Sequence, residues 1–166
     1  MTENEQKPNE QEEVSLYEKI IGRTEELFDS GRKNLDEALK KAGEDLASAG
    51  NFTREQSEKI SAYVKRDLEH ALDNAGKAHE NLKEAVAPGR VAAGAQSLFS
   101  RILSSTAETF SDWAHKSERQ LEFKTGEITS PGTLTCKNCH EQIHMRKTAR
   151  IPPCPKCHQT LFRKSY

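Results

Sequence analysis

The chain has 166 residues, of which 34% are hydrophobic and 31% are charged, and its formal net charge is -1. This composition allows a modest buried core and favours an elongated helical protein, because a narrow bundle buries one stripe of each helix. No stretch approaches the roughly 18 consecutive apolar residues that cross a bilayer, and the N-terminus lacks the apolar run of a secretory signal. We therefore expect a soluble, cytoplasmic protein without membrane contact.

Charge is distributed unevenly along the chain. Residues 1–125 hold 18 Lys or Arg against 24 Asp or Glu, a net of -6, whereas residues 126–166 hold 7 against 2, a net of +5. Segments of opposite sign should meet different partners, or each other.

The first 13 residues are rich in Glu and are predicted to form a disordered acidic tail. An amphipathic helix should follow, because apolar residues recur at the helical spacing of three and four. These residues are Val14, Tyr17, Ile21, Phe28, Leu35, Ala38, Ala42 and Leu46. The pair Ser30-Gly31 leaves open a kink or break in this helix, and Gly50 supplies a stop.

A second helix is predicted to begin at Thr53, because Thr53 and Gln56 have the spacing of a capping box. Its apolar stripe comprises Ile60, Val64, Leu68, Ala71, Ala75, Ala78, Leu82 and Ala85. A third periodic segment contains Val91, Ala95, Phe99, Ile102, Leu103, Thr106, Phe110, Trp113, Ala114 and Leu121. Residues 14–125 therefore predict an elongated antiparallel helical hairpin or three-helix bundle with coiled-coil character.

After Lys124 the sequence becomes typical of β-structure. Residues 126–135 surround the pair Pro131-Gly132, which suits a type II turn, and predict a β-hairpin leading to the first cysteine. Two more short strands are expected at 143–146 and 159–163. Residues 126–166 would form a small domain of short strands, which makes the chain an α plus small β protein.

All four cysteines lie in this C-terminal segment as two Cys-x-x-Cys pairs, Cys136 with Cys139 and Cys154 with Cys157. Each turn of this kind presents two thiolates, and two turns complete the tetrahedral shell that zinc prefers. The separation of 14 residues between the pairs is slightly shorter than usual, which a shorter hairpin can accommodate. The pattern predicts one structural Zn²⁺ bound by these four cysteines, and residues 126–166 are therefore predicted to form a small zinc ribbon.

Two histidines directly follow the cysteine pairs. His140 and His158 occupy the position where such a turn often has a positive φ, and His tolerates that conformation better than most residues. Because four cysteines already fill the shell, we interpret both histidines as turn residues. His144 is expected in a strand.

The predicted site is closed, since no ligand position is open and no carboxylate lies within either cysteine spacer. Zinc would supply most of the folding free energy of the ribbon, roughly 10–16 kcal/mol in comparable peptides. The same ligand set can bind iron, although only Phe162 and Tyr166 offer aromatic cover. Oxidation that ejects zinc would make the site a redox switch.

Several of these segments together resemble the YbeL-like family of bacterial zinc-ribbon proteins of unknown function. The resemblance is carried by Thr53-Arg54-Glu55, Lys65-Arg66-Asp67-Leu68, Gly126-Glu127-Ile128-Thr129, Pro131-Gly132-Thr133-Leu134, both cysteine pairs and Arg150-Ile151-Pro152-Pro153. It implies a bacterial, cytosolic protein with a helical region before a ribbon whose four cysteines bind metal. It implies no reaction.

The sequence favours a non-enzymatic interaction protein that binds another protein through its helices, because no phosphate loop, nucleophile-base pair or open metal site is present. The helical stripes also allow a homo-oligomer. Nucleic-acid binding is the alternative, through the basic residues of the ribbon: Lys137, Arg146, Lys147, Arg150, Lys156, Arg163 and Lys164. The histidines outside the ribbon, His70, His79 and His115, are interpreted as surface or boundary residues, and Trp113 as core.

Overall fold

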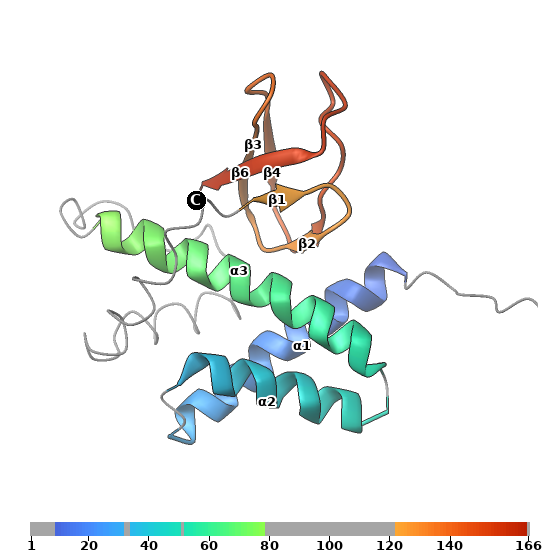
Figure 1. Ribbon diagram of the computed structural model, residues 1–166, viewed down its shortest axis with the longest axis vertical. Helices are drawn as coiled ribbons and strands as arrows, with labels where there is room; N and C mark the ends of the chain where they lie inside the picture. The colour runs from blue at the N-terminus through green and yellow to red at the C-terminus, as the bar shows by residue number, and fades with distance from the viewer. Residues whose placement is uncertain (1–8, 32–33, 51, 79–121, 166) are drawn as a thin grey trace, which may run out of the picture.

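A computed structural model describes residues 9–31, 34–50, 52–78 and 122–165. Three helices come first: α1 (Glu10–Asp29), α2 (Leu35–Ser48) and α3 (Arg54–Ala78). Six short strands follow: β1 (Phe123–Lys124), β2 (Ile128–Thr129), β3 (Gly132–Cys136), β4 (Gln142–Met145), β5 (Ala149–Arg150) and β6 (Leu161–Ser165). The ribbon formed by the strands rests on α1 and α3, and α2 lies on the far side of these helices (Figure 1).

Helix α1 starts four residues before the predicted position. The side chain of Asn9 caps it, and Glu10, Glu12 and Glu13 occupy the first turn. Acidic side chains there interact favourably with the free backbone N–H groups, so the end of the acidic stretch is helical. The first eight residues of the predicted tail lie outside the described residues.

The predicted first helix is broken near Gly31, which the sequence left open. Helix α1 ends at Asp29, and Gly31 adopts a φ of 103°. Helix α2 then begins after Asn34, whose side chain accepts hydrogen bonds from the backbone of Asp36 and Glu37. The break gives two helices of 20 and 14 residues, shorter than a continuous helix over this segment.

The predicted capping box at the start of α3 is confirmed. Thr53 N donates to Gln56 Oε1 at 2.8 Å, and Gln56 N donates to Thr53 Oγ1 at 3.1 Å. The three helices share one apolar core, and its fully buried members include Leu16, Tyr17, Ile20, Ala38, Ala42, Ile60, Val64 and Leu68. The third predicted periodic segment, with Trp113, lies outside the described residues, as do His79 and His115.

The strands form two antiparallel sheets. One has four strands in the order β1-β6-β3-β4, and the other pairs β2 with β5. The predicted hairpin across Pro131-Gly132 is therefore wrong: the segments before and after this pair are strands, but they belong to different sheets. Contacts of Thr129 and Ser130 with α3 hold β2 against the helices, while β3 continues into the larger sheet.

The other two predicted strands exist. Strand β4 coincides with the prediction for 143–146 within one residue at each end. Strand β6 begins two residues later than predicted, because Gln159 still belongs to the second cysteine turn, where its carbonyl accepts from Cys154 N at 3.0 Å.

A buried polar cluster joins the helices to the ribbon, and its centre is Asp67 of α3. Asp67 Oδ2 accepts hydrogen bonds from Tyr17 Oη at 2.5 Å, Thr129 Oγ1 at 2.9 Å and Ser130 N at 2.8 Å. Lys164 Nζ lies 3.7 Å from the same oxygen and donates to the Ser130 carbonyl at 2.8 Å. We call these five residues the seam; all of them are at least 95% buried.

A second group of contacts surrounds the seam. Arg66 forms an ion pair with Glu127 and donates to the carbonyl of Ile128 at 3.1 Å. Its guanidinium also lies 4.1 Å from the centre of the Phe123 ring, a cation–π contact. Because Phe123 already belongs to the large sheet, the ribbon begins before the predicted boundary at residue 126.

The opposite charges of the two segments meet at this interface. Arg150 of β5 pairs with Glu13 of α1 at 2.6 Å, and its backbone N–H donates to Glu10 at 3.2 Å.

Within the described residues, no helix is long and apolar enough to span a membrane.

Candidate metal centre

Two tight turns present the four cysteines. In the first, His140 N donates to Cys136 O at 3.1 Å; in the second, His158 N donates to Cys154 O at 2.9 Å. His140 has a φ of 60° and His158 a φ of 57°. The prediction that both histidines are turn residues with positive φ is confirmed, and both side chains are exposed.

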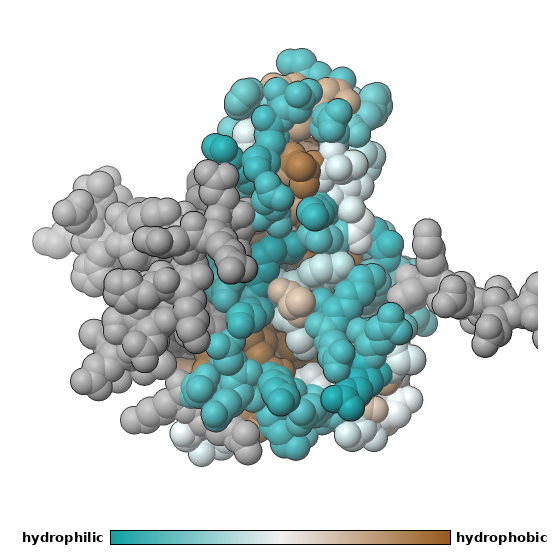
Figure 2. Space-filling model, viewed as in Figure 1, coloured by the Kyte–Doolittle hydropathy of each residue, from teal (hydrophilic) through white to brown (hydrophobic). Residues whose placement is uncertain are grey.

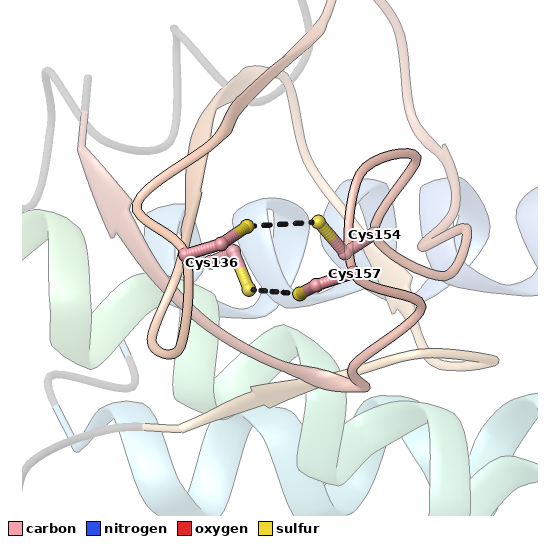
Figure 3. A group of neighbouring side chains, drawn as sticks. Cys136, Cys154 and Cys157 are labelled. Atoms are coloured by element: carbon pink, nitrogen blue, oxygen red, sulfur yellow. Dashed lines mark hydrogen bonds between the residues drawn. The ribbon is translucent and has the colours of Figure 1, made fainter.

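The sulfur atoms of the two turns face one another (Figure 3). Cys136 Sγ lies 3.6 Å from Cys157 Sγ, and Cys139 Sγ lies 3.5 Å from Cys154 Sγ. All four sulfurs lie within 4.8 Å of one another and none is in a disulfide. Tetrahedral zinc with Zn–S bonds of about 2.3 Å requires sulfurs about 3.8 Å apart. The cluster therefore fits one Zn²⁺.

The pKa values of the two partly exposed cysteines are shifted in opposite directions. The backbone N–H of Gln159 helps to lower the pKa of Cys157 to about 6. The N–H of Glu141 acts in the same direction on Cys139, but burial and the neighbouring thiols raise the pKa of Cys139 to about 12. Four thiolates this close repel each other, and a divalent cation removes the repulsion by binding all four.

Apolar side chains enclose half of the cluster. Cys136 and Cys154 are fully buried, and the core of the ribbon also contains Phe123, Leu134, Ile151 and Phe162. Cys139 and Cys157 are partly exposed. A shell of four cysteines leaves no position for a reacting water, which is typical of a structural zinc site.

The fold and the four-cysteine site define a zinc-ribbon protein with a helical region in front of the ribbon. The chain belongs to the family of the zinc-ribbon containing domain, whose family model matches residues 23–165. It is similar to the uncharacterised protein YbeL of three Escherichia coli strains, with 24% identity over 154 residues that cover 91% of this chain and 94% of the relative. No solved structure matches the chain.

The basic residues that the sequence offered for nucleic-acid binding do not form one free surface. Lys164 is buried in the seam, and Arg150 pairs with Glu13 of α1. Both therefore bind the helices of their own chain. Sequence reasoning missed these roles because it counted charges without knowing which face of a strand each side chain occupies.

Two further basic residues of the ribbon have acidic neighbours. Lys137 pairs with Glu122 at 2.6 Å, and Lys156 lies 3.8 Å from Glu141. Exposed pairs of this kind contribute little to stability. The three remaining residues of the set are exposed and form no ion pair with any other described residue: Arg146, Lys147 and Arg163.

The remaining described histidines lie away from the metal cluster. His144 is in β4, as predicted, and its Nδ1 lies 3.1 Å from Thr133 Oγ1. The rings of His70 of α3 and Phe123 form a T-shaped contact with centres 5.4 Å apart, so His70 is a boundary residue between helix and ribbon.

The seam is the main feature that sequence reasoning did not find. One signal was available: Asp67 lies seven residues after Ile60 and next to Leu68, on the apolar face of its helix. A second was Lys164, which alternates with Phe162 and therefore points to the buried face of β6. Charged residues at two inward positions indicate a buried pair, since an unpaired charge would be costly.

Proposed function

We propose that this chain is a non-enzymatic interaction protein in which a structural zinc holds the ribbon and the helical region binds another protein. The closed shell of four cysteines carries this proposal, because a metal with no open position can support a fold but cannot activate a substrate. The buried Asp67 and Lys164 bond to each other and to neighbouring hydroxyls, so neither is available to a substrate.

A small hollow between the N-terminal parts of α1 and α3 supports a protein partner. Its apolar lining consists of Leu16, Phe52 and Ile60. Polar side chains surround it, among them Gln56 and Lys59. Its cavity volume of about 10 Å³ is far below the roughly 300–1,000 Å³ of small-molecule pockets. A hollow of this size holds about one water and no whole side chain, so what it offers a protein partner is a shallow apolar contact with polar surroundings.

Site-specific photo-crosslinking in living cells tests the protein partner. A photoreactive amino acid at Glu12, an exposed residue that lines the hollow, should give one reproducible adduct with another protein. The same amino acid at Glu37, an exposed position on α2, is the control. Adducts at position 12 that do not differ from those at position 37 would contradict a partner at this hollow. Metal analysis of the purified protein should give one zinc per chain, and a substoichiometric value would contradict the structural site.

A further inference from the structure

The outer face of the four-stranded sheet has a composition unlike the rest of the molecule. The strand register places three rows of residues on this face. The first row contains Lys124 and Leu161, the second contains Arg163, Thr135 and Gln142, and the third contains Ser165, Thr133 and His144. The inward positions of the same strands hold the buried core and Lys164. We call these three rows the outer face; none of their residues carries a carboxylate, and Glu122, which precedes β1 at the next alternate position, is paired with Lys137 at 2.6 Å.

This face is accessible and positively charged. Gln142, His144 and Arg163 are exposed. On the side of the ribbon that Figure 2 shows, hydrophilic residues surround a small apolar patch. Arg146 follows β4 at the next alternate position and is exposed too. Neither Arg163 nor Arg146 forms an ion pair with another described residue. The thiolate of Cys136 lies on the opposite side of β3, so the negative charge of the metal site is not presented here.

We propose that the outer face binds the phosphodiester backbone of nucleic acid. Guanidinium and ammonium groups bind phosphates directly, and hydroxyl, amide and imidazole groups donate hydrogen bonds to the same oxygens. Rows two residues apart along a strand are separated by about 6.7 Å, so an extended anionic chain can meet a donor at each row. The cations of Lys124, Arg163 and Arg146 lie along this path.

An acidic protein segment fits this face less well. Stable protein interfaces surround an apolar or aromatic anchor, and among the outward strand positions only Leu161 is apolar. A partner recognised by charge and hydrogen bonds alone suits the composition better. The same positions contain no Phe, Tyr or Trp for stacking on a base, so binding should not depend on base sequence. This inference is independent of the protein partner proposed for the helices.

The test uses the full-length, zinc-loaded protein with two fluorescent probes, a mixed-sequence single-stranded DNA and its duplex. Fluorescence anisotropy should give a Kd of about 1–100 μM at low salt. With about three phosphate contacts, raising salt from 50 to 200 mM should weaken binding about 20-fold for the single strand and about 40-fold for the duplex. The double variant Arg163→Gln/Arg146→Gln should reduce the salt slope by about 1.5.

Matched controls separate this face from general charge. The variant Lys40→Gln removes one exposed cation from α2 and should bind like the wild type. No binding by the wild type at 50 mM salt would overturn the proposal, as would an equal loss in Lys40→Gln and in Arg163→Gln alone. Competition by poly-glutamate as effective as that by unlabelled DNA would show an acidic protein site instead and would also overturn it. The probe that binds more tightly would show whether the face prefers single-stranded or double-stranded nucleic acid.

Discussion

Lys164 and Asp67 face each other in the buried seam, with Nζ 3.7 Å from Oδ2. One comes from the last strand of the ribbon and the other from the middle of α3. Burial would raise the pKa of Asp67, but Lys164, Arg66 and the hydrogen-bond donors hold it below its usual value. A buried charge pair surrounded by satisfied donors fixes one arrangement of the two segments. The ribbon and the helices therefore form one structural unit.

Replacing Asp67→Asn should destabilise the protein by about 3–5 kcal/mol, because it leaves the charge of Lys164 buried without its counterion. Urea unfolding of the zinc-loaded protein, followed by circular dichroism, measures the change. The matched control is Asp36→Asn, which removes the exposed partner of Lys65 and should cost less than about 1 kcal/mol. Equal stabilities of the two variants would contradict the structural role of Asp67.

The double variant Asp67→Leu/Lys164→Met should be more stable than either single variant. Each single replacement leaves one buried charge alone, whereas the double replacement removes both. A double-mutant cycle on the free energy of unfolding should give a coupling of at least about 2 kcal/mol. Additive effects would mean that the two charges do not interact, despite the distance between them.

Stability should rise with pH in the alkaline range because of Lys164. Burial lowers the pKa of this side chain from 10.5 to about 8, against the opposing influence of Asp67. Between these two values the unfolded chain binds more protons than the folded one, so the free energy of unfolding increases with pH. From pH 8 to pH 10 the contribution is about 2–3 kcal/mol.

The measurement compares wild type with Lys164→Met by urea unfolding at both pH values, with zinc in excess. The variant lacks the titrating group and should lose this rise. Burial raises the pKa of Tyr63 above its usual value, and because Tyr63 is present in both proteins its contribution cancels in the difference. Identical pH dependence of the two proteins would show that Lys164 does not change its protonation in this range.

Local patterns predicted the parts of the fold that depend on neighbouring residues. The capping box of α3, the positive φ of His140 and the gathering of the cysteines all follow from short sequence spacings. The pairing of β2 with β5 does not, because it depends on how Thr129 contacts a helix far away in the chain. The Pro-Gly turn chemistry was therefore compatible with a hairpin that the tertiary contacts exclude.

The charge asymmetry shows the same limit. Net charges of -6 and +5 indicated that the two segments could meet each other, and the contacts of Arg150 with Glu13 and of Lys164 with Asp67 realise this. The total charge could not identify the residues, because facing positions on a helix and a strand are set by three-dimensional packing. Only the inward positions of Asp67 and Lys164 carried a readable signal.

Loss of zinc should loosen the helices as well as the ribbon. Strand β3 carries Cys136 and pairs with β6, which carries Lys164. Disorder in these strands would therefore remove partners of Asp67 as well as the metal ligands. Hydrogen exchange measured by mass spectrometry should increase in residues 122–165 of Cys136→Ser, and also in the part of α3 around Asp67, while most of the helical signal remains.

Lys156→Gln is the matched control, since it alters an exposed spacer residue of the second cysteine turn without removing a ligand, and its exchange should resemble that of the wild type. If hydrogen exchange in Cys136→Ser rose only in the ribbon, loss of zinc would not destabilise α3 through the seam. If all helical structure disappeared, the zinc site would be required for the whole fold. The intermediate result is expected because the helices keep their own core, in which Leu16, Ile60 and Val64 are fully buried, whereas a ribbon of this size depends on its metal.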